Sequence, residues 1–351
     1  MITTILSFIF IIGVLVFVHE LGHFLAAKSV GVKVEKFYLG FNFFGLGWKI
    51  DYKGTEYGIG LFPLGGYVKV AGIIDESLDT EYTGEEDEFR SKNALEKIWI
   101  MSAGVIMNFL LAILILSHLT YYNGINDPDP RAMVGQLIPD YPAETLGLNE
   151  GDQILSINGV QTSNWEAMTV EIHKRPKEAI DLTWQRSGVI MQGSVITESA
   201  EQLVGNKIVQ HGRIGIIPLL NHRYVALMES LKIGCERTWY FLDLTFRSFM
   251  ALIKRNVSIK ELSGPIMIAK IAGETASMGI NALLGLMAFI SVNLGFINIL
   301  PIPGLDGGHV LIALIEGMIR RDLPIKINPM TYIIIYHNSR SISSNLVPPH
   351  Y

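Results

Sequence analysis

Three long apolar runs divide the sequence, at about residues 3–27, 97–121 and 279–301. About 20 apolar residues in an α-helix suffice to cross the roughly 30 Å of hydrocarbon in a bilayer. The pattern therefore predicts three transmembrane helices. The third run is followed by Pro301 and Pro303, which interrupt helical hydrogen bonding, and then by a further apolar stretch at 310–319.

Residues 45–72 alternate apolar and polar positions and carry glycines at turn-like spacings. This pattern predicts short strands rather than a helix. Strands at membrane depth need their backbone groups satisfied by protein or by a wet cavity. A re-entrant hairpin beside a polar site would meet that condition, and a cytoplasmic hairpin outside the lipid is the alternative. Residues 75–91 are rich in Asp, Glu and Thr and predict a solvated loop.

Soluble-domain composition is confined to residues 131–219. Within it, the segment DQILSINGV at 152–160 predicts a strand followed by an Asn-Gly turn. Gly147 and Gly151 indicate a helix end and a turn. Farther along, residues 222–262 mix apolar and basic positions at helical spacing, which predicts an amphipathic helix resting on the membrane surface.

The composition supports a membrane protein, since 49% of the 351 residues are hydrophobic and only 17% are charged. A formal net charge of −5 gives no electrostatic basis for binding nucleic acid. The single cysteine, Cys235, excludes an internal disulfide framework and a cysteine zinc cluster. Lysines are frequent between the first two apolar runs, and Arg320, Arg321 and Lys326 follow the third. The positive-inside rule places both segments in the cytoplasm, so that residues 122–222 face outward.

The first apolar run ends in a polar motif, HELGH, at residues 19–23. A charged side chain at the centre of a membrane helix costs about 2.5–3.5 kcal/mol on translocon-type scales, so the motif needs a compensating role. His19 and His23 lie one helical turn apart and can reach one ion. Glu20 beside them can then act as general base, as in zinc hydrolases. A satisfied pair of intramembrane histidines, or a proton relay, is the alternative.

Zinc with two histidine ligands needs a third protein ligand and an open position for water. Asp306, in the segment NILPIPGLDGGHVL, is the candidate because it lies at the inner end of the third run, on the same side as HELGH. A broken segment of this kind is tolerated in a membrane only when it is buried in protein or lines a cavity. Asp306 could instead cap the following helix. His309 is an alternative ligand or a partner of a ligand.

Three motifs in this order carry a resemblance to a known family: HELGH, LGGYVK at 64–69 and NILPIPGLDGG at 298–308. They resemble the site-2 proteases, which are zinc intramembrane endopeptidases, and in particular the bacterial regulator-of-sigma-E branch. The similarity covers about residues 1–325. It implies that His19, His23 and Asp306 bind Zn²⁺ and that Glu20 is the catalytic base.

The resemblance also implies a substrate-binding set. The edge of the hairpin at 45–70 could pair with an unwound substrate by strand addition. Asparagines are also in this set, and their amides suit substrate binding because they both donate and accept hydrogen bonds with a peptide backbone. Asparagines between membrane helices can instead serve as interhelical contacts. Val105 stands where the family often has proline, which weakens the match around one of the asparagines, Asn108. The residues implied are Asn293, Asn298, Asn108, Gly65 and Gly66.

The segment PAETLGLNEGDQILSING at 142–159 resembles a PDZ domain of the periplasmic kind. Such a domain presents a groove beside a strand, and here it either binds a tail or acts as a size filter over the site. The implied fold is a mainly α-helical transmembrane core with a membrane-associated β-hairpin and an inserted α+β PDZ domain. The expected parts are an N-terminal membrane part (1–121), the PDZ domain (122–220), an amphipathic connecting segment (221–278), a third transmembrane helix with the LDGG motif (279–325) and a tail (326–351).

The tail departs from the family, which usually ends with a fourth membrane helix. Residues 326–351 contain an apolar stretch too short to span and then a polar, Ser-rich end, as a truncated or frame-shifted reading frame would produce. The expected function is regulated intramembrane proteolysis in the bacterial inner membrane, with the PDZ domain extracytoplasmic. The substrates implied are single-pass membrane proteins such as anti-sigma factors or signal peptide remnants. A catalytically inactive, PDZ-bearing membrane adaptor is the alternative, and a zinc permease fits less well because one tight site suits conduction poorly.

Overall fold

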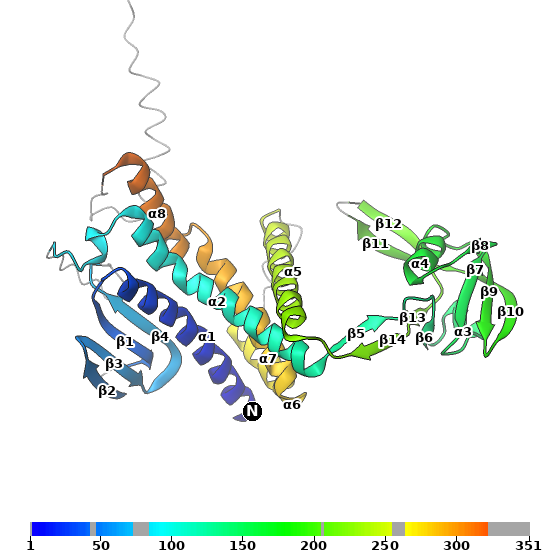
Figure 1. Cartoon of the computed structure of the whole chain (residues 1–351), viewed down its shortest axis with the longest axis horizontal. Helices are drawn as coiled ribbons and strands as arrows, with labels where there is room; N and C mark the ends of the chain where they lie inside the picture. The colour runs from blue at the N-terminus through cyan, green and yellow to red at the C-terminus, as the bar shows by residue number, and fades with distance from the viewer. Residues whose placement is uncertain (1, 43–46, 73–83, 205–206, 255–263, 322–351) are drawn as a thin grey trace, which may run out of the picture. The chain divides into compact units, whose positions relative to one another are not determined.

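The computed structural model describes residues 2–42, 47–72, 84–204, 207–254 and 264–321. The chain splits into two compact units, one of Met1–Tyr121 with Ala226–Tyr351 and the other of Tyr122–Val225. The first holds the long helices and the second is mainly β-structure (Figure 1). The unusual tail at 326–351 lies outside the described residues.

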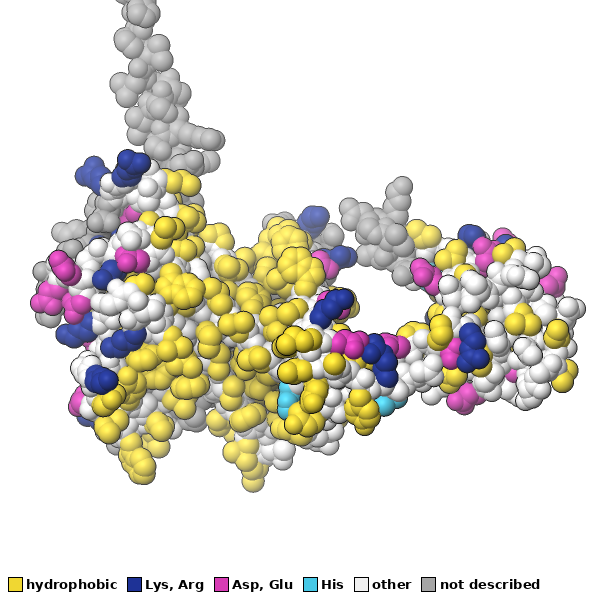
Figure 2. Space-filling view, viewed as in Figure 1, with side chains coloured by type: hydrophobic (Ala, Val, Ile, Leu, Met, Phe, Trp, Pro, Cys, Tyr) yellow, Lys and Arg dark blue, Asp and Glu magenta, His cyan; other side chains and the backbone are white. Residues whose placement is uncertain are grey.

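Helices form at all three predicted positions, as α1 (Ile2–Ser29), α2 (Ala94–Asn123) and α7 (Ile280–Ile299). Each is long and apolar enough to cross a bilayer. Their buried contacts include Ile11 and Leu15 of α1, Ala112 of α2 and Met287 of α7. Figure 2 shows hydrophobic side chains gathered over the surface of these helices. The helices are therefore apolar both where they pack against one another and on their exposed surface, apart from the polar residues at the HELGH motif.

Glycine lets α1 and α2 approach each other closely beside the HELGH motif. A Cβ atom on Gly22 would lie 2.4 Å from the backbone oxygen of Ala103. No larger residue fits there without moving a backbone, so the two helices are in direct contact at this level. The contact brings α2 against the face of α1 that carries both histidines.

The helix after α7 begins where the prolines predict a break. The chain leaves α7 at Ile299, and α8 (Asp306–Ile319) starts after a short irregular segment. A Cβ atom on Gly307 would lie 2.2 Å from the backbone oxygen of Ile299, and one on Gly308 would lie 2.5 Å from that of Ile302. The two glycines therefore let the first turn of α8 fold tightly back on the break, which fixes the position of Asp306.

A buried ion pair fastens the other end of α8 to the start of α2. Lys97 Nζ lies 3.0 Å from Glu316 Oε2, and the two side chains are 6% and 14% exposed. Removing one partner of a buried pair takes away part of the compensation of the remaining charge, and this typically costs about 3–5 kcal/mol. We expect Glu316→Gln to lower the free energy of unfolding by that amount, measured by denaturation in detergent.

The matched control is Glu236→Gln, which removes one partner of an exposed pair. Lys232 and Glu236 lie 3.9 Å apart with side chains 76% and 62% exposed. Exposed pairs contribute about 1 kcal/mol or less, so this change should leave stability nearly unaltered. Equal effects of the two substitutions would contradict a structural role for the Lys97–Glu316 pair.

The part of the chain that connects α1 to α2 forms a four-stranded sheet of order β2-β3-β1-β4. Its strands are β1 (Val34–Phe41), β2 (Gly47–Tyr52), β3 (Thr55–Gly60) and β4 (Phe62–Val70). A short 3₁₀ helix follows at Phe89–Ser91. Strands were predicted for 45–72, but β1 was not, so the predicted hairpin is in fact part of a larger sheet. The pattern hides β1 because its neighbouring residues Phe37 and Tyr38 are both buried, which breaks the alternation expected of a strand.

The edge strand β4 lies against α1, near the polar motif. A Cβ atom on Gly66 would lie 2.7 Å from the backbone oxygen of Tyr38 and 3.5 Å from Val16 of α1. At the other edge, β2 exposes Trp48 and Ile50. The sheet thus has one edge next to α1 and one apolar edge away from it.

Two more helices complete this unit, α5 (Leu227–Ile253) and α6 (Pro265–Ser277). The predicted amphipathic segment does form α5, but this helix packs along α2 and α7. A Cβ atom on Gly234 would lie 2.1 Å from Ser117 of α2, and the rings of Phe241 and Phe289 are 5.3 Å apart. Part of the apolar face of α5, which suggested a helix on the membrane surface, therefore packs against α2 and α7.

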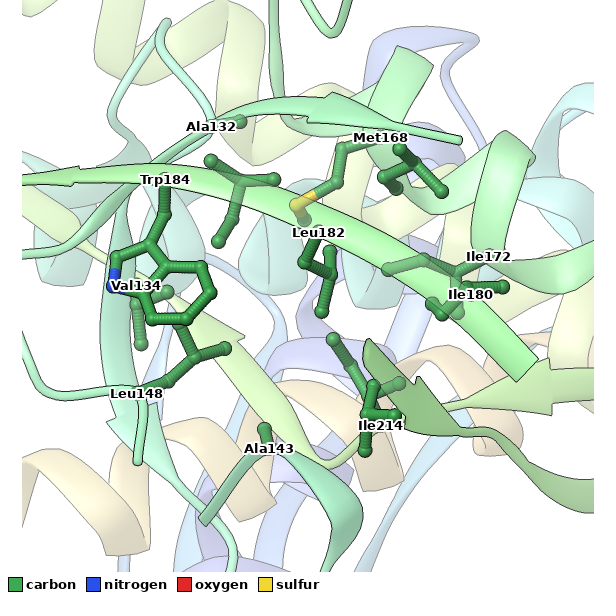
Figure 3. Packing of buried hydrophobic residues seen from close by; sticks show 13 residues of the cluster. Ala132, Val134, Ala143, Leu148, Met168, Ile172, Ile180, Leu182, Trp184 and Ile214 are labelled. Atoms are coloured by element: carbon green, nitrogen blue, oxygen red, sulfur yellow. The ribbon is translucent and has the colours of Figure 1, made fainter. Parts of the chain in front are cut away.

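The second unit contains a four-stranded sheet of order β10-β9-β7-β8 and three two-stranded pairings. Met168, Leu182 and Trp184 lie in its buried core (Figure 3). Its elements, in chain order, are β5 (Ile125–Pro128), β6 (Val134–Leu137), α3 (Pro142–Thr145), β7 (Gln153–Ile157), β8 (Val160–Gln161), α4 (Trp165–His173), β9 (Ala179–Arg186), β10 (Val189–Ile196), β11 (Glu198–Val204), β12 (Lys207–Arg213), β13 (Ile216–Pro218) and β14 (Leu220–Arg223).

The predicted strand and Asn-Gly turn are both present in this unit. β7 and β8 are joined by Asn158 and Gly159, whose φ angles are +48° and +80°, as a tight hairpin turn requires. Asp152, just before β7, is fully buried. Its two carboxylate oxygens accept hydrogen bonds of 2.8 Å from Arg186 of β9. This bidentate pair ties the start of β7 to β9.

Candidate metal centre

The helical spacing of α1 places His19 and His23 on one face, as predicted. Each residue is 7% exposed, and their ring centroids are 4.8 Å apart with the rings nearly perpendicular. The two Nε2 atoms are 3.3 Å apart. Both imidazoles therefore direct the same nitrogen toward one point inside the protein.

Asp306 meets this point from the far end of the sequence. Its Oδ2 lies 3.1 Å from His19 Nε2 and 3.5 Å from His23 Nε2. This oxygen is buried and has no hydrogen-bond partner in the described part of the chain. The cap of α8 is Leu305, and Asp306 is the first residue inside the helix, so the alternative that Asp306 caps α8 is wrong.

The three atoms match the spacing of ligands around zinc. Zinc bonds to histidine nitrogen and carboxylate oxygen are about 2.0–2.2 Å long, so neighbouring ligands of a tetrahedral ion lie about 3.3–3.5 Å apart. The three separations, 3.1, 3.3 and 3.5 Å, span this range. Two neutral nitrogens and one carboxylate are also ligands that zinc accepts in catalytic sites. The residues therefore fit a single divalent cation with one position left for water.

His23 is held in the orientation that a metal needs. Its Nδ1 donates a hydrogen bond of 2.8 Å to the backbone oxygen of Ile100 in α2, which leaves Nε2 free of a proton in the neutral ring. Among the described residues, one set of possible metal ligands has its ligand atoms within 4.8 Å of one another, namely His19, His23 and Asp306. His309, the alternative ligand, does not belong to this set.

Glu20 lies beside the cluster, on the next position of α1. Its side chain interacts electrostatically with His19, His23 and Asp306, and with the backbone N–H of Val68 in β4. The carboxylate is thus next to the candidate metal position without belonging to the ligand set. This placement suits a group that takes a proton from a water molecule.

The predicted substrate-binding asparagines occupy three different environments. Asn298 of α7 is half-buried, and its amide nitrogen lies 3.2 Å from His19 Nε2. Asn108 of α2 is fully buried, with its amide nitrogen 3.1 Å from the other ring nitrogen of His19. Asn293 instead accepts a hydrogen bond from Thr245 of α5 and donates one to the backbone of its own helix. Asn298 and Asn108 therefore lie at the cluster, whereas the contacts of Asn293 join α5 to α7.

Gly65 and Gly66 lie on β4, the strand next to α1. Gly66 pairs with Leu39 of β1, and Gly65 has a φ of +148°. The other side of β4 has no partner strand among the described elements. The segment is thus a sheet edge without a partner strand, buried or half-buried over residues 65–70, and its Val68 is among the groups that act on the Glu20 carboxylate.

Gly104 of α2 was not predicted as a site residue, yet it packs directly on both histidines. A Cβ atom here would lie 2.4 Å from His23 Nε2 and 2.7 Å from His19 Cε1. The signal in the sequence is its spacing, four residues before Asn108 and hence on the same helix face. Because glycine has no side chain, Gly104 leaves the space that the two imidazole rings occupy.

We expect Gly104→Ala to displace the rings and to weaken zinc binding by at least about 10-fold, the lower end of the losses found when the partners of metal ligands are changed. Competition with a chromophoric chelator measures the affinity. Gly285→Ala is the control, because a Cβ atom there meets nothing nearer than 4.0 Å. Wild-type affinity in Gly104→Ala would show that the rings have room to move.

The second unit has a groove of about 220 Å³ between α4 and the segment 213–218. Its walls are mainly apolar, with Met168 and Ile172 on one side and Ile214 and Ile216 on the other, and Arg213 also lines it. A groove beside a strand is what the PDZ resemblance predicts.

The family model described as Peptidase family M50 matches residues 7–337 of the chain. Proteins named "Putative zinc metalloprotease" from Vibrio cholerae and Campylobacter jejuni are 32% and 34% identical to it. The alignments cover 94% and 91% of this chain and 94% and 85% of the relatives. A Rickettsia conorii protein of that name is 34% identical over 90% of this chain and 89% of its own.

Among solved structures, the PDZ domain of the SdrC-like protein Lmo2051 from Listeria monocytogenes covers 27% of this chain and 94% of its own. It is 19% identical, with a TM-score of 0.22. A likeness at this level does not establish a common fold.

Proposed function

The chain belongs to peptidase family M50, and we propose that this zinc metalloprotease hydrolyses peptide bonds within or near the transmembrane segments of single-pass membrane proteins. The observation that carries the proposal is the convergence of His19, His23 and Asp306. His19 and His23 lie on α1, which is long and apolar enough to cross a bilayer, and Asp306 begins α8 shortly after α7, a second helix of that kind. A protease that acts on soluble substrates does not need its metal ligands on or next to helices that can cross a bilayer.

In this proposal His19 and His23 supply Nε2 and Asp306 supplies Oδ2 to Zn²⁺. When bound, zinc lowers the pKa of a coordinated water toward 7 and polarises the carbonyl of the bond to be cut. Glu20 takes the proton from the attacking water and delivers it to the leaving amine. The backbone of Val68 in β4 is near enough to act on this carboxylate, so the base lies next to β4.

We infer that the substrate binds at the edge of β4 that has no partner strand among the described elements. A helical substrate hides its carbonyls in internal hydrogen bonds and must unwind before it can be cut. An unwound segment can add to β4 as a further strand, next to Gly65 and Gly66 and within reach of Glu20. Asn298, beside His19 Nε2, can donate a hydrogen bond to the substrate carbonyl.

We place the protein in the bacterial inner membrane, with the unit Tyr122–Val225 outside the cytoplasm as a PDZ-like domain. The basic residues between α1 and α2 and after α8 support this orientation. Anti-sigma factors and signal peptide remnants are single-pass proteins of the expected kind. The apolar groove lined by Ile172 and Ile216 favours binding of a peptide segment over a purely steric role.

Reconstitution into liposomes with a single-pass substrate tests the proposal. The substrate should carry helix-weakening residues in its membrane segment, and mass spectrometry should locate the bond that is cut. We expect cleavage inside or next to that segment, its loss when a chelator removes zinc, and its return when zinc is added. The absence of cleavage by the zinc-loaded protein, or cleavage that persists without metal, would favour the adaptor alternative or another mechanism.

A further inference from the structure

Asn108 is a buried amide whose contacts are incomplete in one specific way. Its side chain is fully buried on α2, and its amide nitrogen lies 3.1 Å from His19 Nδ1. Its amide oxygen is buried too but has no hydrogen-bond partner among the described residues. Its backbone oxygen accepts a hydrogen bond of 2.7 Å from Ser291 of α7, so the residue is fixed from two sides.

The chemistry of His19 decides which end of this amide is needed. A neutral imidazole carries one proton, on either Nδ1 or Nε2. His19 Nε2 faces Asp306 and His23, so a metal ligated there leaves the proton on Nδ1. Nδ1 is then a donor, and its neighbour must accept. With the amide nitrogen toward Nδ1, the ring proton would lie on Nε2 and block the metal.

We propose that Asn108 is a positioning residue that presents its amide oxygen to His19 Nδ1–H when zinc binds. A half-turn of the amide exchanges nitrogen and oxygen without moving anything else, and it gives the unpartnered oxygen a donor. His23 already has the equivalent acceptor in the backbone oxygen of Ile100. Both ligand rings are then fixed through Nδ1 by acceptors on α2, eight residues apart.

This inference depends on the zinc site proposed above, but it differs from a role in substrate binding. The full burial of Asn108 separates it from a substrate, and its partner is a metal ligand. It also differs from a purely structural contact between helices. A structural contact would affect folding, whereas an acceptor for His19 affects zinc affinity and depends on the chemistry of the side chain.

Two substitutions of similar size separate these roles. Asn108→Asp keeps an oxygen acceptor, and Asn108→Leu removes it. We expect Asn108→Leu to weaken zinc binding about 10–100-fold and Asn108→Asp to bind zinc as well as the wild type or more tightly. Zinc affinity of the full-length protein in detergent is measured by competition with a chelator. The visible absorption of bound Co²⁺ reports the coordination geometry.

Asn293→Leu is the matched control, because its amide binds Thr245 and the backbone of α7, and its zinc affinity should not change. If Asn108→Leu does not fold, Asn108→Ala replaces it and is interpreted in the same way. Wild-type affinity in these variants, or an equal loss in Asn108→Asp, would overturn the inference alone. A wild-type protein that binds no zinc would instead overturn the proposed function.

Discussion

The Glu20→Gln protein is expected to bind zinc normally and to cleave a single-pass substrate about 10²–10⁴-fold more slowly, the usual contribution of a general acid–base group. Glutamine has nearly the same size, so the packing of α1 should be unchanged. It cannot accept the proton of the attacking water at neutral pH. The rate constant of cleavage in liposomes and the zinc content per chain together test this expectation.

The zinc measurement is essential to this test. Glu20 lies next to the ligand set without belonging to it, so the amide should leave the metal in place. Loss of zinc together with activity would show that Glu20 is a ligand rather than a base. Cleavage at the wild-type rate would show that another group moves the proton.

Asp306→Ala should have an equally large effect by a different route. It removes the one carboxylate of the ligand set and leaves two histidines. Changing only the partners of metal ligands typically costs about 10–100-fold in affinity, so we expect loss of a ligand to exceed about 100-fold. Cleavage should disappear at zinc concentrations that saturate the wild type.

His309→Ala is the control, since this residue is three positions farther along α8 and lies outside the cluster. It should retain zinc. Zinc loss in His309→Ala with retention in Asp306→Ala would show that the histidine is the third ligand. A zinc-loaded but inactive Asp306→Ala protein would point to a role for Asp306 other than binding metal.

Local patterns in the sequence were enough to predict the parts of the site that lie within one element. The spacing of His19 and His23 follows from helical geometry, and the helix itself from fourteen residues without a charge between Ile5 and Val18. The break before Asp306 follows from the two prolines. Three long apolar helices were predicted from length and composition, and all three form.

Features that depend on contacts between distant segments could not be predicted in this way. Gly104 packs on the histidines, and the chain separates Lys97 from Glu316 by 219 positions. Neither relation leaves a local pattern. The strand β1 was missed because two adjacent aromatic residues are both buried in it. Asn293 matched a family motif, but its hydrogen bonds go to α5 and its own helix.

X-ray absorption at the zinc edge of the purified wild-type protein and of Asp306→Ala tests the central claim most directly. The account predicts about four light ligands at roughly 2.0–2.2 Å, two of them with the scattering pattern of imidazole. It also predicts that one oxygen ligand is lost or replaced by water in Asp306→Ala. A sulfur ligand, a shell without imidazole, or identical spectra for the two proteins would contradict it.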